Sequence, residues 1–109
     1  MIPKIPQPNM YAIYDPVKNR WSRGGWGPKW HKKSPKTWTM GHLKNHLAMF
    51  VHGDYVKKQI VIRNSYDGCK IVDVTTGLEY TGMTIKDYLL KKAIEEANHR
   101  PGYKVKTNE

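Results

Sequence analysis

The chain has 109 residues, a formal net charge of +10 and 39% hydrophobic residues. This length predicts one domain with a single modest core. No apolar run approaches the roughly 18 residues that a transmembrane helix needs, so we expect none. The chain begins with MIPKIPQPN, which has prolines and no hydrophobic region, and we expect no signal peptide. The single cysteine, Cys69, cannot form an internal disulfide, which favours a reducing cytoplasm.

The positive charge is concentrated in the first half of the chain. Residues 1–54 carry nine Lys and Arg against two acids, a net charge of +7, whereas residues 55–109 carry a net charge of +3. A total of +10 on 12.7 kDa is more than solubility requires. The charge therefore predicts a polyanionic partner, either nucleic acid or an acidic protein surface. We expect no membrane partner, and the sequence leaves the oligomeric state open.

The first part of the chain is predicted to be an arm followed by a β-hairpin. Residues 1–9 are proline-rich and extended, and residues 10–14 and 20–23 form the two hairpin strands around a turn at Asp15. The glycine-rich run GGWGPKW then predicts a loop. Residues 36–38 are a candidate third strand.

Two amphipathic helices are predicted. Thr39 caps the first, whose apolar residues from Met40 to Val51 share one face, and we expect it to end near His52, before Gly53. Thr84, followed three residues later by Asp87, resembles a capping box at the start of the second helix. This helix spans residues 85–98, and its predicted buried stripe comprises Leu89, Leu90, Ala93, Ile94 and Ala97.

A second hairpin is predicted between the helices, from strands at residues 59–63 and 69–75, with a turn at 64–68. The whole is an α+β fold: a small antiparallel sheet built from two β-hairpins packed against two amphipathic helices. Residues 10–100 form the domain, and residues 101–109 a flexible tail. We find no internal repeat in the sequence. The expected core residues are Ile13, Leu43, Leu47, Phe50, Ile60, Ile62, Ile71, Val72, Val74, Leu89, Leu90 and Ile94.

The stretch from residue 18 to residue 44 contains all four tryptophans and eight of the nineteen Lys and Arg, with no acidic residue. Basic side chains attract phosphate and flat aromatic rings stack on bases, so this pattern is typical of a nucleic-acid-binding surface. The same composition suits contact with an acidic protein. We expect Trp21 and Trp38 to pack in the core, and Trp26 and Trp30 to be contact residues. The candidate binding residues are Lys18, Arg20, Arg23, Trp26, Lys29, Trp30, Lys32, Lys33 and Lys36.

Evidence for a catalytic or metal site is sparse. His42 and His46 are four residues apart, so a helix places both on one face, where a metal ion could bind both. Further ligands would have to come from residues such as His31, His52 or Asp54, and no HExxH glutamate is present. The remaining acids are scattered over predicted turns, strands and helices, unlike a two-metal nuclease centre. We expect no cofactor and no catalytic residue, and Cys69 fits a small buried side chain in a strand.

Two resemblances follow from these residues. The runs YAIYDPVKNRWSRGGWGPKW and KTWTMGHLKNHL, over about residues 11–50, resemble small accessory proteins of tailed bacteriophages. That resemblance implies expression in an infected bacterial cytoplasm and a role in host takeover or counter-defence. The basic Arg/Trp hairpin beside an amphipathic helix is also similar to plant ethylene-response-factor DNA-binding domains, in which hairpin strands enter the major groove. The counterparts of the DNA-contacting residues here would be Arg20, Trp21, Arg23 and Trp38.

The sequence thus favours a basic, non-enzymatic accessory protein that binds nucleic acid or a nucleoprotein machine. In this hypothesis the lysines and arginines of the first hairpin and its following loop neutralise phosphates, while Trp26 and Trp30 stack on bases. An alternative is an inhibitor that covers an acidic surface of a host bacterial enzyme or defence complex. A second alternative is a small metal-dependent nuclease that uses His42 and His46.

Overall fold

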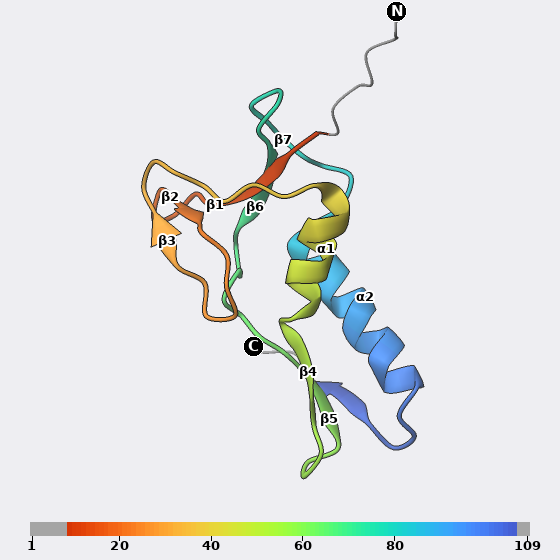
Figure 1. The fold of residues 1–109 in the computed structure, drawn as a ribbon. Helices are drawn as coiled ribbons and strands as arrows, with labels where there is room; N and C mark the ends of the chain where they lie inside the picture. Colours follow the sequence, from red (N-terminus) through yellow and green to blue (C-terminus); the bar gives the residue numbers. More distant parts are fainter. Residues whose placement is uncertain (1–8, 107–109) are drawn as a thin grey trace, which may run out of the picture.

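The computed structural model describes residues 9–106, so nearly all of the arm expected at residues 1–9 lies outside the described part. The predicted α+β class is confirmed, because two helices pack beside two small sheets (Figure 1). One sheet contains the first hairpin. The other lies near the C-terminal end of the second helix.

The larger sheet has five antiparallel strands in the order β3-β2-β1-β6-β7. Its strands are β1 (Tyr11–Asp15), β2 (Arg20–Ser22), β3 (Trp30–His31), β6 (Lys70–Asp73) and β7 (Leu78–Glu79). Strand β1 lies at its centre and pairs with β2 on one side and β6 on the other. The predicted first hairpin is therefore confirmed as β1–β2.

The third strand differs from the expectation. It was predicted at residues 36–38, but the third strand is β3, at Trp30–His31. Trp38 instead forms a single β-bridge with Tyr11. The Trp38 amide donates to the Tyr11 carbonyl at 2.9 Å, and the Tyr11 amide donates to the Trp38 carbonyl at 2.7 Å. Only one residue pair bonds because the chain enters the first helix directly afterwards. This bridge anchors the start of that helix to the central strand.

The smaller sheet has the order β4-β5-β8, from β4 (Val51–Asp54), β5 (Gln59–Ile62) and β8 (Lys104–Lys106). Strands β4 and β5 are antiparallel, whereas β5 and β8 are parallel. The prediction of a flexible tail from residue 101 is wrong at β8. Gly102, with a φ of 83°, turns the chain back after the second helix, and Lys104 then donates its amide to the Lys58 carbonyl at 3.1 Å.

The second predicted hairpin is wrong in its pairing. Strand β5 belongs to the smaller sheet and β6 to the larger, so the two apolar runs do not pair with each other. The hairpins are β4–β5 and β6–β7 instead. Residues 64–68 form a crossing between sheets, and Asp54 and Asp73 provide the turn chemistry that closes the real hairpins.

The hairpins β1–β2, β4–β5 and β6–β7 have the same turn. The Oδ1 atom of Asp15, Asp54 or Asp73 accepts the backbone N–H groups of the residues two and three positions later, at 2.9–3.4 Å. The fourth residue after each Asp has a positive φ, as four-residue hairpin loops often require. These residues are Asn19 (49°), Lys58 (51°) and Gly77 (76°).

The two halves of the chain repeat one order of elements. Each has a strand, an Asp turn, a second strand, a four-residue turn, a third strand and a helix. The first copy is β1-β2-β3-α1 and the second is β4-β5-β6-α2, with β7 inserted before its helix. The sequence analysis missed this repeat because the copies share few residue identities. The third strands also differ in their partners, because β3 pairs with β2 whereas β6 pairs with β1.

The helices are α1 (Met40–Ala48) and α2 (Ile85–Asn98), and neither is long and apolar enough to cross a membrane. Both predicted caps are confirmed, since the Thr39 and Thr84 side chains accept backbone N–H groups at 3.4 and 3.1 Å. Helix α1 ends at Ala48 and not near His52. The apolar spacing continues through Val51 because that residue enters β4, where it is half-buried and pairs with Ile62.

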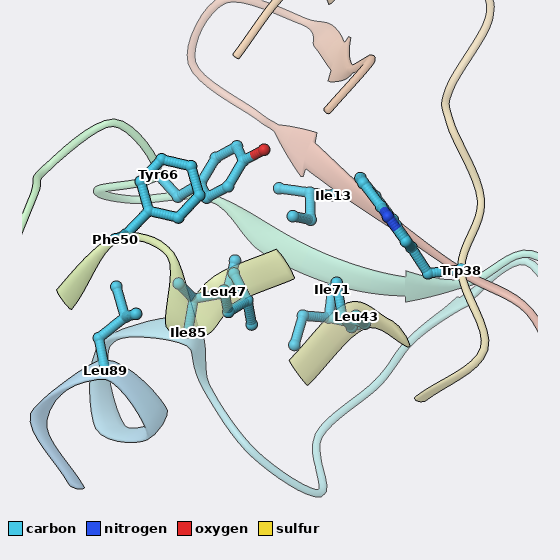
Figure 2. Close-up of a cluster of buried hydrophobic side chains, with 9 residues drawn as sticks. All are labelled: Ile13, Trp38, Leu43, Leu47, Phe50, Tyr66, Ile71, Ile85 and Leu89. Atoms are coloured by element: carbon cyan, nitrogen blue, oxygen red, sulfur yellow. The ribbon is translucent and has the colours of Figure 1, made fainter. Parts of the chain in front are cut away.

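The core lies between the larger sheet and the two helices (Figure 2). It comprises Ile13, Trp38, Leu43, Leu47, Phe50, Tyr66, Ile71, Ile85 and Leu89. Three expected core residues, Val74, Leu90 and Ile94, are instead exposed, and Ile62 and Val72 are half-buried. In α2 the buried residues are Ile85, Leu89 and Ala93, spaced by four. Each residue advances about 100° around a helix, so Leu90 and Ile94 lie beside this stripe, toward solvent.

Candidate nucleic-acid interface

Five of the predicted binding residues are lysines in the loops of the first half. Lys18 lies in the β1–β2 turn, Lys29 precedes β3, and Lys32, Lys33 and Lys36 lie between β3 and α1. All five are exposed, and among residues 9–106 none of them is in an ion pair. We call these residues the loop lysines. Their ammonium groups are exposed to an anionic partner, and no carboxylate of the described chain pairs with them. The ammonium group of Lys36 also lies 5.7 Å from the ring centroid of Trp38.

Arg20 is held within the protein. Its Nε donates to Asp15 Oδ2 at 3.1 Å, and its guanidinium lies 4.0 Å from the ring centroid of Trp30. Burial raises the pKa of Asp15, but hydrogen bonds from the Lys18 and Val17 amides and from Arg20 outweigh it, so the pKa lies below its usual 3.8. The carboxylate therefore stays charged, and Arg20 supports the hairpin.

Arg23 is also engaged internally, although it is exposed. Its Nη1 donates to the Ser34 carbonyl and hydroxyl at 3.2 and 3.0 Å and to the Pro35 carbonyl at 3.2 Å. Arg23 directly follows β2, so these bonds connect the loop after β3 to the end of β2. Arg23 thus fixes the segment that carries Lys32 and Lys33.

Trp26 is 65% exposed and lies in the four-residue turn between β2 and β3. Gly24 and Gly25 precede it with φ values of 78° and 95°, which side-chain-bearing residues adopt at a cost. Arg63 supports the exposed ring: its guanidinium lies 4.1 Å from the ring centroid, and its Nη1 donates to the Trp26 carbonyl at 2.7 Å. The same guanidinium lies 5.0 Å from the ring of Phe50. Trp26 is therefore an exposed aromatic residue held in a defined position.

The other three tryptophans are less available. Trp30 is half-buried, with Arg20 over its ring and the edge of Tyr66 at 5.8 Å between centroids. Trp38 is buried and stacks on His46 at 4.9 Å and 15°, which confirms its place in the core. Trp21 is half-buried against Tyr14, at 4.7 Å. Of the two tryptophans predicted as contact residues, only Trp26 offers a largely free surface.

A buried polar network joins the two halves of the chain behind this surface. Tyr66 Oη lies 2.7 Å from Ser22 Oγ and 2.6 Å from His46 Nε2, and the Gly24 amide donates to Ser22 Oγ at 3.1 Å. In one consistent arrangement, Ser22 donates to Tyr66, and Tyr66 donates to Nε2 of neutral His46. Burial raises the pKa of Tyr66 to about 12. Burial first, and then the Lys36 charge, holds the pKa of His46 below 6.5. The network is neutral and structural.

The structure separates the two candidate metal ligands. His46 is buried and bonded to Tyr66, whereas His42 is exposed. The ring of His46 packs in the core against Trp38 and Phe50, so it does not share an exposed helix face with His42. Across residues 9–106, no group of three or more His, Cys, Asp or Glu is placed to hold a metal ion.

Cys69 is half-buried and lines a cavity of about 490 Å³ beside the N-terminal half of α2. The cavity lining also includes Ile62, Ile85 and Leu89. Burial raises the pKa of the Cys69 thiol to about 12, so the thiol stays protonated near neutral pH. Cys69 was expected to be buried within a strand, but it is half-buried and lies just before β6.

Arg63 and Tyr66 are the residues of this region that the sequence analysis missed. Arg63 supports Trp26, and Tyr66 connects the hairpin to α1. One sequence feature could have indicated them, because an arginine precedes an aromatic residue by three positions at Arg23/Trp26, Arg63/Tyr66 and Arg100/Tyr103. The first two of these pairs occupy the same place in the repeated order of elements.

No protein-family model, curated protein sequence or solved structure matches this chain. The interpretation of its function therefore depends on the geometry and charge described above.

Proposed function

We propose that this protein binds nucleic acid, or a nucleoprotein machine, without catalysis. The contact surface is formed by residues 16–19, 23–29 and 32–37, which are loops of the first half. The observation that carries the proposal is that these loops present five exposed lysines without an acidic partner together with an exposed tryptophan. Lysines supply phosphate contacts, and the tryptophan supplies a surface for a base.

The resemblance to phage accessory proteins supports a setting for this activity. We infer a role in the cytoplasm of an infected bacterium, in host takeover or counter-defence. A small basic protein that engages nucleic acid electrostatically associates rapidly with its target.

Salt dependence tests the phosphate contacts. If the loop lysines engage about five phosphates, log K should fall against log salt with a slope of roughly −4 to −5 on duplex DNA. The binding constant would be measured by fluorescence anisotropy at several salt concentrations. A salt-independent binding constant would contradict the proposal.

A pair of matched variants shows whether the charge acts from these loops. Lys32→Gln with Lys33→Gln removes about two phosphate contacts, so the slope of log K against log salt should become shallower by roughly 2 on duplex DNA. Lys86→Gln with Lys91→Gln removes the same charge from α2, where both lysines are exposed and outside any described ion pair. This control should change the slope little. Equal effects of the two pairs would mean that only net charge matters.

The rival function is inhibition of a host protein through an acidic surface. Exposed apolar residues at the β4–β5 turn favour it, because Tyr55 and Val56 are 68% and 93% exposed beside Lys57 and Lys58. Exposed apolar side chains rimmed by charge are a common feature of protein contacts. Capture from bacterial lysate with and without nuclease treatment distinguishes the two functions. A partner retained after nuclease treatment favours the inhibitor, and a partner lost favours nucleic acid.

A further inference from the structure

The first hairpin lacks the free side chains needed to read a DNA duplex. In the ethylene-response-factor arrangement, Arg20, Trp21, Arg23 and Trp38 would contact the major groove. Here Arg20 is bonded to Asp15, Arg23 donates to backbone and side-chain oxygens of the loop after β3, and Trp38 is buried. Trp21 is half-buried. The groups that would recognise base edges are therefore already used inside the protein.

Neither helix supplies a basic face for a groove. Helix α2 carries three lysines and three acids, so its charge is balanced. Helix α1 has a single lysine and packs three residues into the core, namely Leu43, His46 and Leu47. Duplex readers commonly insert a helix or a two-stranded ribbon into the major groove. In the hairpins of residues 9–106, the exposed lysines outside ion pairs lie in or beside the turns, at Lys18, Lys29, Lys57 and Lys58, and not on the strands that would enter a groove.

Trp26 is arranged for a different contact. Arg63 stacks on its ring at 4.1 Å and fixes its carbonyl at 2.7 Å, yet 65% of the residue remains exposed. A guanidinium stacked on an indole attracts it through the ring quadrupole and limits its motion. A flat ring held in this way can stack on a base only where that base is not already stacked between two neighbours. Such bases are found in single strands, loops and bulges.

We propose that the surface binds an unpaired nucleic-acid strand, with one base stacked on Trp26 and the adjoining phosphates on the loop lysines. The inference rests on the proposed function and specifies its substrate. Arg63 is a positioning residue: it holds Trp26 from within the protein and leaves the opposite side of the ring to the base. Single-strand binders commonly combine lysines along the backbone path with aromatic stacking platforms.

The first test compares strands and variants. Fluorescein-labelled (dT)15, (rU)15 and a 15-base-pair duplex would be titrated with the protein by anisotropy at two salt concentrations. We expect the single strands to bind more tightly than the duplex, with a salt slope near −3.5 for about five phosphates. Trp26→Ala should weaken single-strand binding by about 5- to 150-fold, which corresponds to about 1–3 kcal/mol of stacking, and should change duplex binding little.

Tyr55 provides a matched control for Trp26. It is 68% exposed and has the Arg100 guanidinium at 5.3 Å from its ring, but it lies in the β4–β5 turn, away from the loop lysines in the fold. Tyr55→Ala should leave single-strand binding unchanged. An equal loss from both substitutions would mean that exposed aromatic residues contribute without a specific site, which would overturn the proposal.

A double-mutant cycle tests the role of Arg63. Arg63→Lys keeps the charge but loses the planar stack and should weaken single-strand binding in the native background. In a Trp26→Ala background the same substitution should have no further effect, because Arg63 acts through Trp26. An additive loss would show instead that Arg63 contacts phosphate directly.

The outcomes of these experiments distinguish the single-strand inference from the proposed nucleic-acid-binding function on which it rests. If duplex binds as tightly as single strand and Trp26→Ala changes neither, nucleic-acid binding stands and the single-strand inference is wrong. If no nucleic acid binds even at low salt, both are wrong and the protein-inhibitor function gains support. Urea unfolding of each variant shows whether a lost signal reflects lost folding.

Discussion

Two turns at equivalent places in the chain treat their aromatic residues in opposite ways. Residues 25–28 and 65–68 each form a four-residue turn after the second strand of a repeat, and each has an aromatic residue second, three positions after an arginine. Trp26 in the first turn is 65% exposed, whereas Tyr66 in the second is 3% exposed. One position thus presents a ring to solvent in one half and completes the core in the other.

The strand pairing around each turn explains the difference. The first turn closes a hairpin, because the Arg23 amide donates to the Lys29 carbonyl at 2.7 Å, so Trp26 projects from the edge of the larger sheet. The second turn lies where the chain crosses from one sheet to the other. Tyr66 is there covered by Phe50, with the ring centroids 4.8 Å apart (Figure 2). The ring of His46 also covers it, at 5.6 Å between centroids. The burial of an aromatic residue in such a turn depends on what the following strand pairs with.

Substitution at the two aromatic positions should give the largest contrast. Tyr66→Ala removes a buried ring and should lower the free energy of unfolding by roughly 3–5 kcal/mol. Tyr66→Phe should lower it by about 1–3 kcal/mol, because Ser22 and His46 lose their shared hydrogen-bond partner inside the core. Urea unfolding followed by far-UV circular dichroism measures both.

Trp26→Ala is the comparison for those variants. Since its ring is mostly exposed, its loss should cost the fold no more than about 1 kcal/mol, chiefly through the Arg63 stack. If Trp26→Ala destabilised the protein as much as Tyr66→Ala, the ring would be part of the structural core. The contrast between the two turns, and the proposed contact role of Trp26, would then both be wrong.

The pH dependence of stability probes the network behind Tyr66. Burial lowers the pKa of His46 in the folded state, so below pH 6.5 the unfolded chain takes up a proton at this residue before the folded chain does. The free energy of unfolding should therefore fall as pH decreases from about 6.5 to the lowered pKa. The slope from this one proton cannot exceed about 1.4 kcal/mol per pH unit. Urea titrations at several pH values between 7.5 and 5 would measure it.

His46→Gln separates this effect from other titrating groups. Glutamine can accept the Tyr66 hydroxyl hydrogen bond but does not titrate, so the variant should show a shallower loss of stability in the same window. A slope identical to that of the native protein would exclude His46 as its source. Asp15 does not interfere, because its lowered pKa acts below pH 3.8.

Local features of the fold were predictable from the sequence, whereas its long-range pairing was not. Helix α2 and both N-caps are set by residues within one or two turns of helix, and the Asp15 turn sits between its own two strands. The partner of β6 is β1, about sixty residues earlier, and nothing near Ile71 or Val72 specifies that choice. The apolar residues at 50–51 fit a helix face and a strand equally well, which explains the error in the end of α1.

The candidate site shows the same division. Composition predicted that lysines of residues 18–36 would be exposed, since charged side chains rarely bury without partners. It could not show that Arg20 and Arg23 would be engaged inside the protein or that Arg63, from the other half, would support Trp26. Those contacts depend on how the two repeats pack against each other. The only indication of them in the sequence is the arginine that precedes an aromatic residue by three positions in each repeat.

The smallest expected effect concerns the Asp turns that the two halves share. Lys58 and Gly77 occupy the same position, fourth after the turn Asp, with φ values of 51° and 76°. A lysine in this conformation destabilises the folded state by roughly 1–2 kcal/mol. Glycine avoids this strain but loses more conformational entropy on folding, which costs about 0.5–1 kcal/mol. Lys58→Gly should therefore raise the free energy of unfolding by up to about 1 kcal/mol.

Gly77→Lys should lower the free energy of unfolding by a similar amount, since an added Cβ there meets no atom within 4 Å and only the backbone conformation is strained. Urea unfolding of both variants checks the pair, and changes of the same sign would show that the two turns are not equivalent.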